Sequence, residues 1–183
     1  TLSFSKSGKR LFFGTSAISI PKDTSLIDID KVNVDVWHYK DDYIQPVQLR
    51  NLDNELKRNY LAVYHLETGT LKQLASKEMP LVLQSNEGDG DMFTGVTDFG
   101  KRIESQWIGN TLKDIYAVDP VTGNKKIVKE NLNWQASPSP AGNYILWYDR
   151  KARNYFVYDG ETETNITKNI KVPLWDEEFD NPD

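Results

Sequence analysis

The stretch SPSPAGNYILWYDRKARNYFVYDGETETNIT (137–167) holds two Tyr-rich apolar segments separated by polar turns. Gly142 follows the first turn, and glycine adopts the positive φ that many tight turns need. The second half, from 153 onward, has an apolar strand pattern, a turn rich in Asp, Gly, Glu and Thr, and a shorter strand that closes with an aliphatic residue. This is the pattern of a β-hairpin. The stretch therefore predicts a unit of consecutive antiparallel strands.

The same pattern occurs three times along the chain. Each copy has a glycine within a polar turn, and these glycines are Gly8, Gly100 and Gly142. We expect each turn to lead into a strand, with the turns at 6–9, 98–101 and 140–143. Each copy is followed by a hairpin pattern, at 58–74, 113–128 and 153–167. The chain thus consists of three related β units.

The spacing of the units indicates the fold class. From Gly100 to Gly142 is 42 residues, within the roughly 40 to 50 of a four-stranded propeller blade. From Gly8 to Gly100 is 92 residues, and the excess lies around 15–58. There, VNVDVWHYKDDYIQPVQL predicts a long strand pair and NLDNELKRN a helical turn. We therefore predict an all-β fold with very little helix, a partial β-propeller of about three antiparallel four-stranded blades. An open sheet stack or sandwich of the same hairpins also fits.

The whole chain, 1–183, is expected to form a single propeller segment. Its predicted parts are a decorated blade at 1–85, a connector around QSNEGDGD, blades at 91–133 and 134–170, and an acidic tail or linker at 171–183. Propellers typically carry four to eight blades, so three blades predict a fragment of a larger propeller. The start at Thr1, directly within a strand pattern, also suggests a cut piece.

Composition excludes several classes of function. The net charge is −5, with acidic and basic residues interspersed, whereas a nucleic-acid footprint needs clustered Lys and Arg. No apolar run approaches the roughly 20 residues that span a bilayer, so no membrane span is expected. Cysteine is absent, which excludes disulfides and thiolate metal sites but does not decide the compartment. Nucleic acid is therefore not an expected partner, and the localisation stays open.

Three segments carry a resemblance to a known family: VDVWHYKDDYIQPVQL (34–49), ELKRNYLAVYHLETGTLKQL (55–74) and the stretch 95–128. They resemble the N-terminal propeller of bacterial prolyl-oligopeptidase-family serine peptidases of the acylaminoacyl or dipeptidyl peptidase type. In that family the propeller sits over an α/β-hydrolase domain and restricts entry to short peptides. The resemblance implies a non-catalytic role in substrate gating, with a hydrolase domain as partner and peptides as the substrates of the parent protein. It also suggests a periplasmic or secreted location.

Two other readings stay open. One is a stand-alone protein-interaction propeller of the Tol-type translocation kind, which would hydrolyse nothing. The other is a glycan-binding or glycan-cleaving propeller, which would need paired carboxylates converging on one cleft. Glu104 is a poor candidate for such a pair because the sequence shows no partner for it.

The sequence predicts no catalytic residue, cofactor or metal site. It lacks the G-x-S-x-G motif of a serine-hydrolase nucleophile, and His38 and His65 both lie in apolar strand patterns. NEGDGD (86–91) has oxygen ligands but does not match a calcium-binding loop, so we interpret it as a connector. NIT (165–167) fits a glycosylation sequon, but we assign it no role because such short matches are common by chance.

One segment predicts a polar patch. In RIESQW, three polar residues alternate with Ile103, Ser105 and Trp107, which would place them on one face of a strand. They are Arg102, Glu104 and Gln106, and Glu104 takes the place that an apolar residue holds in the other two units. Charged groups are costly to bury without partners. This face should therefore line the central channel, contact substrate or lie on the exposed side of a blade.

Four tryptophans are expected to pack between blades: Trp37, Trp107, Trp134 and Trp147. Asp35 would share a strand face with the first of them. Because three blades leave two terminal blade faces uncovered, we also expect self-association through these faces. The residues predicted for this contact are Phe12, Phe13, Trp147 and Tyr148. Alternatively, the inserted segment 15–58 would fold over the open face of the first blade.

Overall fold

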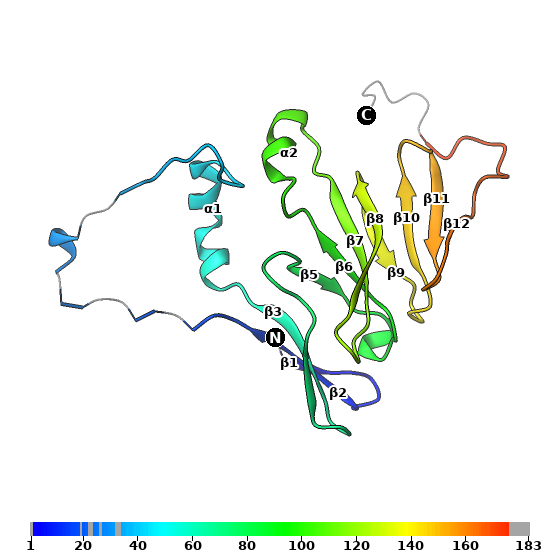
Figure 1. Cartoon of the computed structure of the whole chain (residues 1–183), viewed down its shortest axis with the longest axis horizontal. Coiled ribbons are helices and arrows are strands. Elements are labelled where there is room, and N and C mark those ends of the chain that lie inside the picture. The colour runs from blue at the N-terminus through cyan, green and yellow to red at the C-terminus, as the bar shows by residue number, and fades with distance from the viewer. Residues whose placement is uncertain (1, 19, 22–23, 26, 32–33, 176–183) are drawn as a thin grey trace.

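The chain forms three four-stranded antiparallel sheets that stand side by side (Figure 1). The computed structural model describes residues 2–18, 20–21, 24–25, 27–31 and 34–175. The first sheet has β1 (Leu2–Phe4), β2 (Arg10–Thr15), β3 (Tyr60–His65) and β4 (Thr70–Gln73). The second has β5 (Leu81–Leu83), β6 (Phe93–Thr97), β7 (Lys113–Val118) and β8 (Lys125–Leu132). The third has β9 (Ala136–Pro138), β10 (Ile145–Asp149), β11 (Asn154–Tyr158) and β12 (Glu163–Asn165). The all-β, partial-propeller prediction is confirmed.

Helix is a minor component of the described residues. The two α-helices are α1 (Gln45–Leu56, 12 residues) and α2 (Arg102–Ile108, 7 residues). Two short 3-10 turns accompany them, η1 (Asp28–Asp30) and η2 (Asn86–Gly88). Both α-helices lie in connections between strands, at one end of the strands (Figure 1).

The repeated glycines stand where the turns need them. Gly8, Gly100 and Gly142 have φ of 74°, 78° and 79°, the left-handed region that glycine enters without steric cost. The turns at 6–9 and 140–143 lead into β2 and β10, as predicted. The turn at 98–101 leads instead into α2, so that part of the prediction is wrong.

Two of the hairpins close with the same aspartate-centred turn. Asp119 Oδ1 accepts the N–H groups of Val121 (2.8 Å) and Thr122 (3.3 Å). Asp159 Oδ1 accepts those of Glu161 (2.9 Å) and Thr162 (2.7 Å). In both turns the threonine hydroxyl also donates to the aspartate. The side chain thus supplies hydrogen bonds that fix the turn, which explains the Asp-x-x-Thr repeat in the sequence.

Two apolar cores join the three sheets. Between the first and second sheets, Phe12 and Val63 pack with Phe93 and Val118. Between the second and third sheets, the buried core residues are Ile115, Leu132, Ala136, Ile145, Trp147 and Tyr158. The sheets are therefore held together face to face by burial of apolar surface.

Trp147 anchors the second of these cores, as predicted for packing between blades. It is 1% exposed, and its ring is stacked on Phe156 at 6.0 Å with a 10° interplanar angle. Lys129 of β8 lies over both rings, at 5.9 and 5.4 Å from their centroids. The same lysine forms an ion pair with Glu163 at 3.2 Å. A cation–π contact and an ion pair thus bridge the second and third sheets.

The boundary between the first two units lies earlier than predicted. β5 pairs with β6 in the second sheet, so the first unit cannot extend to residue 85. The stretch 86–91 is no connector between blades, because it lies within the second sheet between β5 and β6. It contacts the first sheet through Lys6 and Glu87 (2.7 Å) and through Ser7 N and Asp89 (2.6 Å). The third sheet spans 136–165.

The segment between β2 and β3 differs from the prediction. No strand occurs at 34–44, and α1 occupies 45–56 where a strand pair and one helical turn were expected. Pro46 lies in the first turn of α1, where a missing N–H costs nothing. Leu49, Leu52 and Leu56 follow at helical spacing. The alternation around Asp35 and Trp37 therefore marks no strand face.

The outer faces of the first and third sheets are open. Leu2, Phe4 and Leu71 are 70%, 63% and 53% exposed, so the segment 15–58 does not cover the first sheet. Phe12 and Trp147 were predicted for these outer faces but are buried between sheets.

Of the acidic tail 171–183, residues 176–183 lie outside the described residues. Within the rest, the Arg153 guanidinium lies 4.4 Å from the Trp175 ring centroid.

Candidate functional site: a decorated rim

The connections between the second and third strands of the three sheets lie at one end of the molecule (Figure 1). They differ greatly in length: 16–59 in the first sheet, 98–112 in the second and 150–153 in the third. The first two contain α1 and α2. We call residues 34–59 and 98–112 the decorated rim. The β1–β2 and β3–β4 turns lie at the opposite end of the strands (Figure 1).

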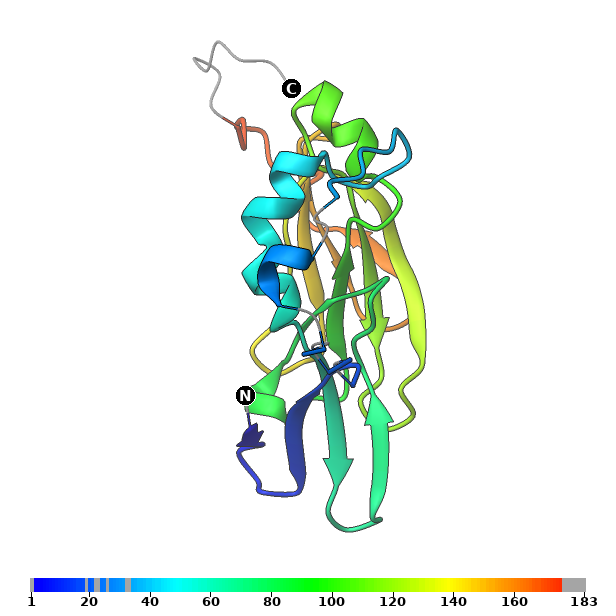
Figure 2. The ribbon, with the colours of Figure 1, turned by 90° about the vertical axis from the view of Figure 1, so that its left-hand side faces the viewer.

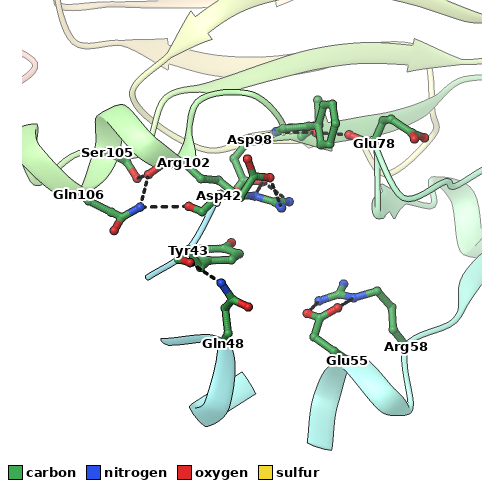
Figure 3. A network of polar contacts seen from close by, with 12 residues as sticks. Asp42, Tyr43, Gln48, Glu55, Arg58, Glu78, Asp98, Arg102, Ser105 and Gln106 are labelled. Atoms are coloured by element: carbon green, nitrogen blue, oxygen red, sulfur yellow. Dashed lines mark hydrogen bonds and ion pairs between the residues drawn. The ribbon is translucent and has the colours of Figure 1, made fainter. Parts of the chain in front are cut away.

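Arg102 joins the two parts of the decorated rim (Figure 3). Its Nη1 lies 3.2 Å from Asp42 Oδ2, and its Nη2 lies 2.8 Å from Asp98 Oδ1. Its Nε also donates to Asp98 Oδ1 at 2.9 Å. The guanidinium lies 5.1 Å from the ring centroid of Tyr43. The Arg102 side chain thus contacts two residues of 34–59, Asp42 and Tyr43. It also forms an ion pair with Asp98, which lies in the same part of the decorated rim as α2.

Two glutamines add to this contact. Gln106 Nε2 donates to the carbonyl of Asp42 at 3.0 Å (Figure 3). Gln48 of α1 donates to the carbonyl of Tyr43 at 2.7 Å and to Asp41 Oδ2 at 3.3 Å. The turn 41–43 is therefore held from α2 on one side and from α1 on the other. We call the contacts of Arg102, Gln106 and Gln48 with this turn the latch.

Electrostatics keep the latch charged. Burial works against the charged guanidinium of Arg102, but the hydrogen bond and charge of Asp98 outweigh it and raise the pKa of Arg102. Burial, together with the charge of Asp98, raises the pKa of Tyr43. The phenol therefore stays neutral and the guanidinium stays cationic at physiological pH, which is the pairing that a cation–π contact requires.

A second ion pair closes the far end of α1. Arg58 Nε donates to Glu55 Oε2 at 2.6 Å, and its Nη2 also contacts Glu55 (Figure 3). This hydrogen bonding lowers the pKa of Glu55 and raises that of Arg58. Both side chains are well exposed, so the pair adds little to stability. The pair lies where the chain leaves α1 and leads into β3.

The predicted polar patch is only partly correct. Residues 102–108 form a helix rather than a strand, so the three polar residues do not share a face. Arg102 and Gln106 lie one turn apart and both contact Asp42. Glu104 is exposed and falls on another side of the helix. Gly109 ends the helix in the left-handed region, with φ of 72° and its N–H bonded to Ser105 O.

The sequence contained a signal for the ion pair that lies beside the latch. Asp98 and Arg102 are four residues apart, the spacing of a helical ion pair, and Ile103 and Trp107 have the same spacing. Asp42 and Tyr43 were missed because they lie about 60 residues away. Nothing local in either segment indicates that contact.

The decorated rim presents aromatic side chains to solvent. Trp107, Tyr39 and Trp37 are 86%, 81% and 67% exposed. The prediction that Trp37 and Trp107 pack between blades is therefore wrong. Trp134 is half exposed, lies edge-on to Tyr148 at 6.4 Å and carries Arg150 over its ring. It sits on the outer side of the third sheet, so it too does not pack between the described sheets.

The histidines have structural partners. His65 Nε2 lies 2.9 Å from the carbonyl of Pro120 and ties the first sheet to the β7–β8 turn. His38 Nδ1 accepts the N–H of Lys40 at 3.2 Å within a turn.

Among the described residues, no three His, Asp or Glu side chains are grouped so as to hold a metal ion. In the same part of the chain, no helix has the length and apolar character to cross a membrane.

Comparisons with known proteins give a structural likeness but no sequence match. No family model matches the chain, and no curated protein matches its sequence. Among solved structures, TolB from Acinetobacter baumannii matches over 92% of this chain and 32% of that chain, with 13% identity and a TM-score of 0.42. This chain thus spans about a third of the length of that protein. The resemblance to peptidase propellers finds no support in these comparisons.

Proposed function

We propose that this chain is a non-catalytic polypeptide-recognition module that binds its partner with the decorated rim. The observation that carries the proposal is the group of exposed aromatic side chains on this rim, Trp37, Tyr39 and Trp107. Aromatic residues are enriched at protein interfaces, and tryptophan and tyrosine are prominent among the residues that dominate binding energy. Their large apolar surfaces favour a partner that removes them from water.

The latch supports this function by positioning the aromatic residues. Trp107 lies on the helix that carries Arg102 and Gln106, and Tyr39 precedes the turn that these residues hold. A surface held in place before binding loses less conformational entropy when the partner arrives. The decorated rim therefore combines exposed apolar groups with a polar frame that fixes them.

The partner is proposed in two forms. In the first, it is an α/β-hydrolase domain of the same protein, and this chain restricts or selects peptides for it. This form is supported by the resemblance of 34–49 to peptidase propellers, because these residues form part of the decorated rim. In the second, the chain is an interaction propeller of the Tol-type kind and the partner is a separate protein. A G-x-S-x-G motif followed by Asp and His downstream of residue 183 in the gene would favour the first form.

The first form is tested by binding. The hydrolase domain would be produced as a separate polypeptide, and its affinity for this chain measured by calorimetry. A Trp37→Ala, Trp107→Ala double variant should bind at least about 30-fold more weakly, the loss expected when about 2 kcal/mol of interface contact is removed. A Leu66→Ala variant on the opposite rim is the matched control and should bind as wild type. Equal affinity of all three proteins would contradict the proposal.

A further inference from the structure

Helix α2 uses one part of its surface for the latch and exposes another. Arg102 and Gln106 contact the turn 41–43. Glu104 and Trp107 are exposed instead, and they lie three residues apart, a spacing that makes side chains neighbours on a helix. Figure 2 shows α2, in green, at one end of the strands. A ring and a carboxylate thus lie next to each other on the exposed surface of the decorated rim.

Cations over aromatic rings recur in this chain. Three of its tryptophans carry the charged end of a lysine or arginine over the ring: Trp147 with Lys129 at 5.9 Å, Trp134 with Arg150 at 5.4 Å and Trp175 with Arg153 at 4.4 Å. Lys129 also forms an ion pair with Glu163 at 3.2 Å. Arg102, which lies over the Tyr43 ring, pairs with Asp42 at 3.2 Å. In both cases one ring and one carboxylate hold the same cation.

Trp107 has the neighbouring carboxylate but no cation. Among the described residues, no lysine or arginine lies over its ring, and none pairs with Glu104. Both basic residues of 98–112 are bound elsewhere. Arg102 is held in the latch and by Asp98, and Lys101 pairs with Asp114. The described part of the chain therefore provides the ring and the carboxylate, and leaves the place of the cation open.

We propose that Trp107 and Glu104 hold an arginine or lysine side chain of the partner polypeptide. This inference rests on the proposed function of the decorated rim and names the chemistry of the partner. The cationic group would lie over the indole, and the Glu104 carboxylate would accept its N–H groups. Ile103 and Ile108, which are 41% and 49% exposed, flank the pair and would contact apolar residues on either side of the basic one.

Nuclear magnetic resonance of the indole N–H groups tests the inference. Two probe peptides would be titrated into the isotope-labelled chain: acetyl-Leu-Arg-Leu-amide, and the same peptide with citrulline in place of arginine. Citrulline keeps the shape of arginine but carries no charge. The Trp107 signal, identified by its absence in Trp107→Phe, should shift with the arginine peptide. The citrulline peptide should bind at least about fivefold more weakly, because it lacks the ion pair with Glu104.

Two variants separate Glu104 from charge in general. Glu104→Gln should weaken binding of the arginine peptide about fivefold and leave the citrulline peptide unchanged. Asp53→Asn is the matched control, because it removes an exposed carboxylate from α1 in the same rim, where Leu56 rather than a tryptophan follows three residues later. It should bind the arginine peptide as wild type does.

Three results would overturn the inference: no shift of the Trp107 signal with the arginine peptide, equal affinity for both peptides, or equal losses in the two variants. The proposed function is judged separately, by the affinity of the hydrolase domain for the Trp37→Ala, Trp107→Ala variant. A rim that loses the hydrolase domain in that variant but binds both peptides equally would keep its proposed function without a site for a basic side chain.

Discussion

Gly100 and Gly142 share nearly the same left-handed backbone, with φ of 78° and 79°, but differ in surroundings. A Cβ at Gly100 would meet nothing within 4 Å, whereas one at Gly142 would lie 2.5 Å from Ser85 Oγ and 3.1 Å from Gly90 Cα. Gly142→Ala should therefore cost more stability than Gly100→Ala. We expect about 1 kcal/mol for Gly100→Ala from the backbone alone. Gly142→Ala should lose about 1 to 3 kcal/mol more from crowding.

Urea unfolding followed by tryptophan fluorescence measures both losses. The pair shares a backbone conformation, so the difference between the two variants isolates the contact between the second and third sheets. Equal losses would show that the turn at Gly142 relaxes away from Ser85.

Asp159 makes stability depend on pH. The N–H groups of Thr162 and Glu161 donate to its carboxylate and lower its pKa. A carboxyl group with a depressed folded-state pKa stabilises the fold above its unfolded pKa of about 3.9, and this contribution is lost as the pH falls through the folded pKa. Asp159→Ala should therefore be less stable than wild type at pH 7, and the gap should close toward pH 2.

Thermal unfolding between pH 7 and pH 2 checks this. Thr162→Val is the companion variant, because it removes the hydroxyl but keeps both N–H donors of the turn. It should retain most of the pH dependence of wild type, because the hydroxyl lowers the pKa of Asp159 less than the two N–H groups do. A stability gap for Asp159→Ala that stays constant across this range would contradict the role given to the carboxylate.

At the scale of elements, the latch should hold the turn 41–43 and α1 in place without adding to global stability. Arg102→Gln removes the ion pairs with Asp42 and Asp98, and should loosen the turn 41–43 and α1. Hydrogen exchange in these segments should accelerate at least about tenfold, which corresponds to about 1.4 kcal/mol. Global stability should change little, because α1 has no buried residue and adds nothing to the two cores.

Arg50→Gln is the matched control for this prediction, since it removes an exposed arginine from α1 itself. Its exchange rates should stay at wild-type values. If both variants accelerate exchange equally, the loss of positive charge rather than the latch would be the cause.

The elements that sequence reasoning found are those with local signals. The three hairpins were predicted because each has a turn rich in Thr, Gly, Asp or Glu between two apolar strands. RIESQW was wrongly predicted to be a strand because its residues fit both the strand period and the helix period. Arg102, Glu104 and Gln106 alternate as in a strand, while Ile103 and Trp107 have helical spacing. Only Gly109, which ends α2, separates the two readings.

The missed parts depend on distant contacts. β5 has three residues and belongs to the second sheet only through its pairing with β6. The segment 34–44 alternates like a strand but pairs with no other strand among the described residues. The latch joins Asp42 to Arg102 across 60 positions. Local patterns carry no information on such contacts.

At the scale of the whole molecule, one tryptophan packs in a core and another lies on the proposed binding surface. Trp147 is 1% exposed in the core between the second and third sheets, and Trp107 is 86% exposed on the decorated rim. Trp147→Ala should cost about 3 to 5 kcal/mol, as large core truncations do. Trp107→Ala should change stability by no more than about 0.5 kcal/mol. Chemical denaturation of both variants measures the difference, and a large loss for Trp107→Ala would place that residue in a core.

Site-specific photo-crosslinking tests the central claim, that the decorated rim is the binding surface. A benzophenone amino acid would replace Trp107 on the decorated rim, or Leu66 on the opposite rim, in the protein with its natural flanking sequence and in its own cells. Both positions are exposed in this chain. We predict that irradiation gives a polypeptide adduct from position 107 and none from position 66. Adducts from position 66 alone, or equal yields from both positions, would contradict the account.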